Sequence, residues 1–237
     1  MYTYKVMDSI YYDIDIQQKL STDVCKEAIG GLFEELGKLQ LDFCIKNGLM
    51  PTDKLLDIGC GCFRGGIKFI KYIGPNNYYG HDISPKFINA GKKILDNNNI
   101  KYNEKNFITN DDFDFKKFST VKFKQIIAIS VFTHLRLNSL KICLYNIYNI
   151  LEDKGKFFIS FFEINDNKYI INSYKHSSVC GSSNFGDGVT TYYNKDPYHY
   201  FLSDLKNMIP NGLRYRIEYI GDWNHPRNQM MVCFHKY

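Results

Sequence analysis

The feature that most constrains this fold is an apolar strand that runs directly into a glycine-rich turn and then a helix. The strand is expected over residues 54–58, and Gly59, Gly61, Gly65 and Gly66 follow it. The helix is expected over about residues 65–73, ending before Gly74-Pro75. Glycine permits a tight turn and a close backbone approach, and the amide groups that open a helix can point at a ligand. The segment predicts a nucleotide-type binding loop.

From Pro51 onward, strand and helix patterns alternate along the chain. This alternation is typical of an α/β fold with a doubly wound sheet. Helices are expected over residues 23–47, broken at Gly30-Gly31, from Ser84-Pro85 onward, and over residues 203–209. Another helix is expected to carry Leu140, Leu144, Ile147 and Leu151 on one face and to end at Gly155. Seven strands are expected, at residues 54–58, 77–81, 106–109, 125–129, 156–162, 213–219 and 229–235.

Residues 163–202 show no clear period and are too long for a simple connector, so they are expected to form a lid or substrate wall. The 237 residues can fill one domain. The most apolar stretches, 126–132 and 156–162, are too short to span a membrane, and residues 1–10 contain no signal-peptide core. These features predict a cytoplasmic protein without membrane association. The net charge of +5 comes with scattered lysines, which disfavours a nucleic-acid partner.

The cysteines are odd in number and lack the spacing of a disulfide framework. Several lie in apolar segments, where a reduced cysteine behaves as a small hydrophobic residue. Cys60-Gly61-Cys62 has no second pair at zinc-ligand spacing nearby, so no metal site is expected. All seven are expected to be reduced and structural: Cys25, Cys44, Cys60, Cys62, Cys143, Cys180 and Cys233.

Three residues around the glycine turn indicate which ligand it binds. Asp82 ends the second strand, 21 residues after Gly61, where an acid can accept two hydrogen bonds from a ribose diol. Arg64 stands where a dinucleotide fingerprint has its third glycine, which disfavours a pyrophosphate-binding dehydrogenase. Asp57 precedes the first glycine by two residues and favours a ligand with an amine, such as the methionine end of S-adenosylmethionine.

Taken together, these motifs resemble the class I S-adenosylmethionine-dependent methyltransferases. Leu-Asp-Ile-Gly-Cys-Gly and Gly-His-Asp-Ile-Ser are similar to the first two family motifs. Residues 110–113 resemble the acidic turn that contacts adenine, and residues 130–134 resemble the fourth motif. The resemblance covers about residues 23–237 and departs at Phe63, where many members have glycine. The Cys-Phe-Arg-Gly-Gly version is similar to a bacterial subgroup acting on small molecules and saccharides.

The resemblance implies a mostly parallel seven-stranded Rossmann-like sheet with an antiparallel last strand, N-terminal helices and an insert after strand five. It implies one methyltransferase domain over residues 1–237, with an N-terminal helical cap (1–50), a cofactor half (51–162) and a substrate part (163–237). Asp111 and Asp112 are equally consistent with a solvated turn. The cofactor implied is S-adenosyl-L-methionine, and its expected contacts are Asp57, Gly59, Cys60, Gly61, Arg64, Asp82, Ile83, Asp111, Asp112 and Ser130.

Two segments are candidates for the chemistry. His134 follows strand four at the edge where ligands bind, and it could act as a general base, cap the next helix or pack under the adenine. His225 and His199 are the next candidates for the base. In the turn over residues 221–229, Trp223 could stack on the acceptor or cover the core, and Arg227 could bind an anion or pair with Asp222. Most tyrosines of residues 192–200 are expected to pack.

These observations predict methyl transfer to a hydroxyl of a small molecule. The resemblance implies a saccharide or nucleotide sugar of surface-polysaccharide assembly, and we expect it to be anionic, bound by Trp223, His225 and Arg227. One alternative is N-methylation of an amine, protein or RNA, although the Asn/Asp-Pro-Pro-Tyr/Phe signature of amino-group nucleic-acid methyltransferases is absent after strand four. The other is a binding subunit without turnover, which the intact loop and Asp82 disfavour. The oligomeric state is not predicted.

Overall fold

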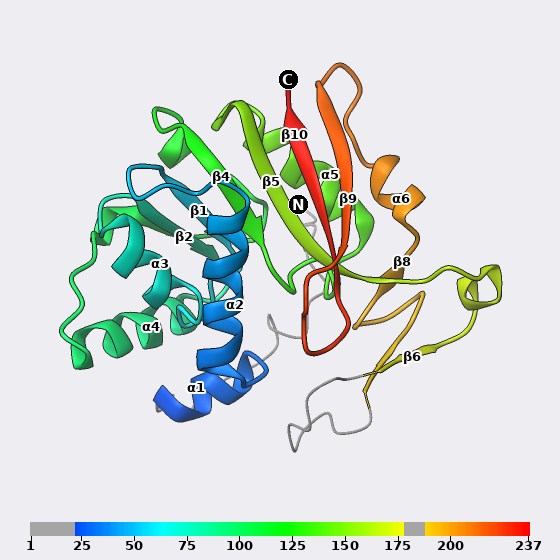
Figure 1. Ribbon diagram of the computed structural model, residues 1–237, viewed down its shortest axis with the longest axis horizontal. Helices are drawn as coiled ribbons and strands as arrows, with labels where there is room; N and C mark the ends of the chain where they lie inside the picture. Colours follow the sequence, from blue (N-terminus) through cyan, green and yellow to red (C-terminus); the bar gives the residue numbers. More distant parts are fainter. Residues whose placement is uncertain (1–21, 178–187) are drawn as a thin grey trace, which may run out of the picture.

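The computed structural model describes residues 22–177 and 188–237. Cys180 and the N-terminal residues 1–10 lie outside these ranges. The chain forms a mixed sheet in the order β3-β2-β1-β4-β5-β10-β9 (Figure 1). Its strands are β1 (Leu55–Ile58), β2 (Tyr78–Asp82), β3 (Phe107–Thr109), β4 (Phe123–Ala128), β5 (Leu151–Glu163), β9 (Tyr215–Asp222) and β10 (Met230–Lys236).

The sheet is parallel from β3 to β5, and β10 then runs antiparallel between β5 and β9. The predicted α/β class, mostly parallel sheet and antiparallel last strand are therefore confirmed. A short strand, β8 (His199–Tyr200), adds a parallel pairing to the end of β5, with Phe162 opposite His199. This pairing brings the insert back to the sheet.

Helices cover both faces of the sheet. On one face lie α1 (Thr22–Ala28), α2 (Phe33–Lys46), α3 (Gly66–Ile73) and α4 (Pro85–Asn97), and on the other lie α5 (Leu137–Ile147) and α6 (Leu202–Lys206) (Figure 1). Ser84 caps α4 as expected, because its hydroxyl accepts the Phe87 amide at 3.4 Å and Pro85 suits the first turn. The break at Gly30-Gly31 is also confirmed.

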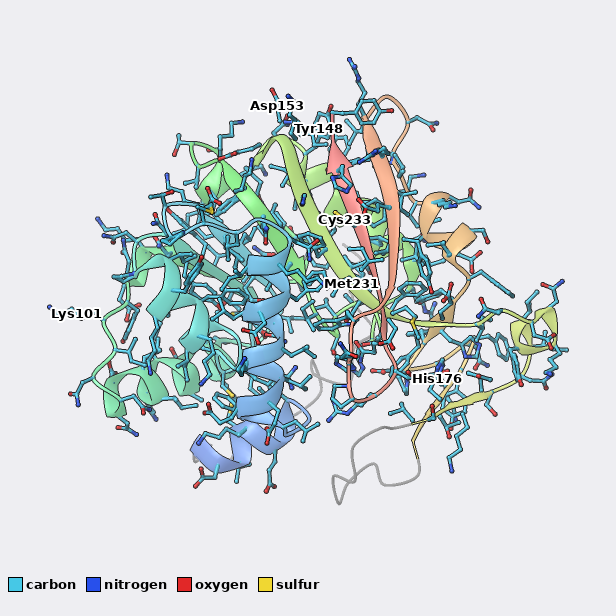
Figure 2. All side chains as sticks on the ribbon, viewed as in Figure 1. Lys101, Tyr148, Asp153, His176, Met231 and Cys233 are labelled. Carbon is cyan, nitrogen blue, oxygen red and sulfur yellow. The ribbon has the colours of Figure 1, made fainter. Side chains whose placement is uncertain are left out.

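Each face of the sheet buries its own apolar cluster. Met231 and Cys233 alternate along β10 and so share one face, where they pack with Phe43 and Phe158 (Figure 2). Val232 and Phe234 point to the opposite face, toward α5. Side chains two apart on a strand share a face, so the two clusters fix the register of β10 against β5.

The structure corrects one predicted helix end. α5 stops at Ile147, and Leu151 is already the first residue of β5. Leu151 is buried in the same cluster as Leu140 and Leu144, which is why its position fitted the helical period. Gly155 therefore does not end a helix but lies inside β5, beside Lys154 with a positive φ of 62°.

The insert, residues 163–202, contains more regular structure than its sequence indicated. Besides β8, it includes an antiparallel pair of strands, β6 (Tyr174–His176) and β7 (Val189–Thr191). Figure 2 labels His176 on β6. The His176 and His199 imidazoles both bond the Thr191 hydroxyl, at 3.1 and 2.7 Å. These bonds tie the strand pair to β8.

Candidate functional site

One cavity of about 430 Å³ lies at the carboxyl edge of the parallel strands. Its wall includes Gly59 after β1, Asp82 and Ile83 at the end of β2, and Ser130 after β4. Its volume falls within the range of small-molecule sites, about 300–1,000 Å³. Ligands of open α/β sheets bind at this edge, where the strand order reverses. The fold thus places the predicted loop and the predicted acid in one cavity.

The glycine loop is held in a conformation that other residues rarely adopt. Gly59 and Gly61 have positive φ values of 72° and 54°. A Cβ atom on Gly59 would lie 2.4 Å from the Val131 side chain, so a larger residue would close the cavity floor. The Gly59 and Cys60 amides donate to the His81 carbonyl at 2.8 and 3.0 Å, which fixes the loop against β2.

Asp82 links the glycine loop after β1 to the start of α4. Its Oδ2 accepts the Gly61 amide and its Oδ1 accepts the Ser84 amide, both at 2.8 Å. Burial raises the pKa of Asp82 to about 6, against hydrogen bonds from Ser84 and Gly61 that act in the opposite direction. A carboxylate oxygen can accept more than one hydrogen bond. Asp82 can therefore hold the loop and still accept from a diol.

Asp57 is the second buried acid of the cavity. Burial raises its pKa to about 7, although the Tyr78 hydroxyl donates to its Oδ2 at 2.8 Å and lowers the pKa in part. Asp82 nearby raises the Asp57 pKa further, whereas Arg64 lowers it. A cation placed beside Asp57 would favour its ionised form. This is the environment expected of a group that receives an amine.

Arg64 lines the cavity but has a different role from the one its position in the motif indicated. Its guanidinium donates to the carbonyls of Ile29 at 2.9 Å and Gly31 at 3.3 Å, in the turn between α1 and α2. Arg227 donates to the Gly30 carbonyl in the same turn. Residues 27–30 also line the cavity. Two buried arginines thus fasten the N-terminal helices over the cofactor loop.

The loop after β4 contributes the opposite wall. Ser130 has a positive φ of 58°, its amide donates to the Ser160 hydroxyl at 2.7 Å, and its own hydroxyl donates to Gln229 Oε1 at 3.0 Å. The Ser160 hydroxyl donates to the same oxygen at 2.6 Å. This network joins β4, β5 and β10 below the cavity. Sequence reasoning gave Gln229 no role, although it is the last residue of the turn over residues 221–229.

His134 and Asp196 meet at the far wall of the cavity. The His134 Nδ1 lies 2.5 Å from Asp196 Oδ1, and both residues line the cavity. The Asp196 side chain is only 9% exposed and that of His134 is 21% exposed. The Tyr198 amide donates to the Thr133 carbonyl at 2.7 Å, which places the insert beside the loop after β4. Sequence reasoning missed Asp196, since nothing local links positions 62 residues apart.

The comparisons with known proteins agree with this geometry. The magnesium protoporphyrin IX methyltransferase of Synechocystis with bound S-adenosylmethionine aligns with a TM-score of 0.55 and 14% identity, over 85% of this chain and 81% of that chain. A TehB-like S-adenosylmethionine-dependent methyltransferase of Corynebacterium glutamicum gives 0.55 and 15%, over 90% and 92%. The family model described as a methyltransferase domain matches residues 56–157. Residues 56–157 therefore match a methyltransferase domain, and the chain as a whole shares the fold of these methyltransferases.

The cofactor predicted from the sequence, S-adenosylmethionine, is the one bound in the Synechocystis structure. The matched residues begin one position before Asp57 and end within β5, so they include the glycine loop, Asp82 and the loop after β4. Within residues 22–177 and 188–237, every helix falls short of the length and apolarity that a bilayer span requires. In the same ranges, no group of three or more His, Cys, Asp or Glu side chains is arranged to hold a metal ion.

The two acids of the predicted adenine-binding turn do not line the cavity, contrary to the prediction. Asp111 and Asp112 are absent from the cavity wall formed by the described residues, and Asp112 accepts the Asp114 amide at 3.0 Å on the surface. Phe113, which has a φ of 57°, lines the cavity instead, near His81. The left-handed backbone at Phe113 turns its ring inward and leaves the two acids outside, as the solvated-turn alternative required.

The hairpin between β9 and β10 also departs from the prediction. Trp223 is buried against Phe43 with ring centroids 5.4 Å apart, and its indole donates to the Gln229 carbonyl at 2.9 Å. Neither Trp223 nor His225 is part of the cavity wall formed by the described residues. Trp223 covers the core rather than the acceptor. Arg227 alone of the three predicted substrate contacts lines the cavity, and its guanidinium braces the α1–α2 turn.

The two alternative histidines, His225 and His199, are poor bases. Burial, together with the nearby Arg64 and Arg227, lowers the pKa of His225 to about 3. Burial also lowers the pKa of His199, whose Nε2 lies 3.0 Å from the Tyr169 carbonyl in the insert. Tyr198 and Tyr200 stack in the core, in agreement with the packing role expected for these tyrosines. The six cysteines within the described residues are reduced and buried.

Proposed function

We propose that the protein transfers a methyl group from S-adenosylmethionine to a hydroxyl oxygen of a small molecule, with His134 as the general base. The observation that carries this proposal is the His134–Asp196 pair in the wall of the cofactor cavity. A second part of the proposal is that residues 1–237 form one methyltransferase domain. In it, the insert contributes to the acceptor side of the site.

Asp196 would set the state of the imidazole. A carboxylate accepts hydrogen bonds, so its contact with Nδ1 favours the tautomer with a proton on Nδ1 and a lone pair on Nε2. That lone pair can take a proton from an acceptor hydroxyl. The Asp196 side chain is largely buried, and its negative charge would stabilise the imidazolium that forms. Proton removal by a positioned histidine contributes roughly 10²–10⁴-fold to a rate.

The residues at the carboxyl edge of the strands have the chemistry that the cofactor requires. Asp82 would accept the ribose hydroxyls, Asp57 would balance the ammonium group, and Ile83 and Phe113 would flank the adenine. Bound S-adenosylmethionine supplies a methyl group on a sulfonium, a strong electrophile. The protein would then hold the acceptor oxygen in line with that group, exclude water and accept the proton at His134.

The N-methylation alternative receives less support from this cavity. An amine that attacks as the free base needs no strong base, whereas His134 and Asp196 form an arrangement that serves proton removal. A binding subunit without turnover would need no such pair. The narrower acceptor class, an anionic saccharide or nucleotide sugar, rests on the resemblance and on Arg227. Because Arg227 already donates to the Gly30 carbonyl, only part of its guanidinium could receive an anion.

The test compares His134→Ala with Asp196→Asn. His134→Ala should lower kcat by roughly two to four orders of magnitude and leave S-adenosylmethionine affinity unchanged. Asp196→Asn keeps the shape but removes the charge, so it should lower kcat and move the pH profile of kcat/KM while cofactor affinity stays the same. Cofactor affinity is measured by titration calorimetry. Normal turnover in His134→Ala would refute the assignment of the base, and lost cofactor binding would indicate a structural role.

A further inference from the structure

The acceptor side of the cavity has mostly apolar walls and one pair of polar side chains that contact each other. Beyond the glycine loop, the wall comes from the loop after β4, the end of β5 and the insert. These segments contribute nine lining residues, of which six are apolar and three are polar: Ile129, Val131, Leu135, Phe162, Val189 and Pro197, and Ser130, His134 and Asp196. His134 and Asp196 contact each other.

The other polar groups of this wall are already engaged within the protein. Gln229 Oε1 accepts from the hydroxyls of both Ser130 and Ser160. Phe162 is held in place by His176, whose ring centroid lies 4.7 Å away. A buried polar group keeps its free energy low only when its hydrogen bonds are made. Within residues 22–177 and 188–237, the wall thus offers an entering molecule few new hydrogen bonds other than the one at the His134–Asp196 pair.

A mostly apolar wall should favour a phenol over a saccharide as the molecule that carries the hydroxyl. A saccharide carries a hydroxyl on nearly every ring carbon, and each one that meets an apolar wall loses its bond to water without replacement. A flat apolar ring gains from the same wall, since burial of apolar surface is favourable. A phenol also has a pKa of about 10, whereas an alcohol is close to water at about 15.7, so a histidine removes the phenolic proton more readily.

We propose that the acceptor is a phenol, a hydroxyl on an apolar aromatic ring that packs against Phe162, Leu135, Val189 and Pro197 and points its oxygen at His134. The inference rests on the proposed function and narrows its substrate class. The phenolic oxygen forms a bond to the methyl carbon, and the carbon–sulfur bond breaks with its electron pair remaining on sulfur. The proton passes to His134 and then to solvent. The products are an aryl methyl ether and S-adenosylhomocysteine.

The experiment measures S-adenosylhomocysteine release by the full chain with four matched probes. Phenol and aniline share a ring and differ in nucleophile, whereas methyl glucoside and UDP-glucose represent saccharides. We expect kcat/KM for phenol to exceed that of both saccharides by roughly tenfold or more. Val189→Thr adds a hydroxyl to the wall at nearly constant volume, so it should lower kcat/KM for phenol about three- to tenfold with cofactor affinity unchanged. Val121→Thr, the same change away from the cavity, should leave both values unaltered.

Failure of this inference is distinguishable from failure of the proposed function. If a saccharide is preferred and its methylation is lost in His134→Ala, the hydroxyl chemistry stands and the phenol assignment is overturned. Preference for aniline over phenol, with no effect of His134→Ala, overturns both. If no probe is methylated, binding of phenol and methyl glucoside to the S-adenosylhomocysteine complex decides the matter. Equal affinities there, or a phenol affinity unchanged in Val189→Thr, also overturn the inference.

Discussion

Replacement of Asp82 by asparagine should separate cofactor binding from folding stability. The carboxylate accepts two amides, Gly61 on one oxygen and Ser84 on the other. Asparagine has a single acceptor oxygen, so it can keep only one of these bonds. It also removes the charge that we propose the ribose hydroxyls use. The substitution leaves the size of the side chain almost unchanged, so any effect comes from hydrogen bonding and charge.

The two contributions to stability have opposite signs. Burial raises the pKa of Asp82 from 3.8 to about 6, which corresponds to about 3 kcal/mol of destabilisation at pH 7 that asparagine would remove. The amide left without an acceptor costs about 1–3 kcal/mol. The free energy of unfolding without cofactor should therefore stay the same or rise by up to about 2 kcal/mol. Loss of a charge-assisted ribose bond, about 1.5–3 kcal/mol, should weaken S-adenosylmethionine binding roughly 10- to 100-fold.

Urea unfolding and titration calorimetry measure the two quantities on the same preparation. Asp112→Asn is the matched control, because Asp112 is exposed and lies away from the cavity, and it should change neither value. Retained affinity in Asp82→Asn would show that the ribose lies elsewhere. A large loss of stability together with lost binding would show that Asp82 acts only as a brace for the loop.

Two further predictions concern the same cavity. Burial raises the pKa of Asp57 to about 7 and of Asp82 to about 6, so these two acids hold protons in the folded protein that the unfolded chain releases above about pH 4. Their contribution to the free energy of unfolding falls as pH rises from about 4 to about 7, whereas the lowered pKa of His225 acts in the opposite direction. The free energy of unfolding of Asp57→Asn relative to the unsubstituted protein should therefore rise over this range, and a difference that does not change with pH would contradict this. Cofactor affinity of the unsubstituted protein should rise over the same range. Arg227→Lys should lower the melting temperature and the cofactor affinity, because Arg227 braces the Gly30 turn, and it should leave the acceptor KM unchanged. A raised acceptor KM at unchanged stability would instead favour an anionic acceptor.

The cofactor half of the site could be predicted from sequence because its determinants are local. The strand, the glycines and the next strand lie within about thirty residues. The acid at the end of β2, Asp82, meets the loop through a hydrogen bond from the Gly61 amide. Orientation was harder to predict than position. Asp111 and Asp112 were placed in the correct turn, but the positive φ of Phe113 decides which side chain faces the cavity. No residue type in that turn indicates that the Phe113 backbone adopts a left-handed conformation.

Arg64 and Asp196 show why the remaining part could not be predicted. The position of Arg64 in the glycine motif was interpreted as a signal about the ligand, but its guanidinium serves carbonyls at Ile29 and Gly31, more than thirty residues away. Asp196 reaches His134 because backbone bonds such as Tyr198 to Thr133 fold the insert onto the loop after β4. The pair that we propose as the general base comes from two distant segments, so it exists only after both have folded. The acceptor half of the site therefore depends on tertiary contacts. Substitutions within the insert should lower acceptor turnover more than they lower cofactor affinity.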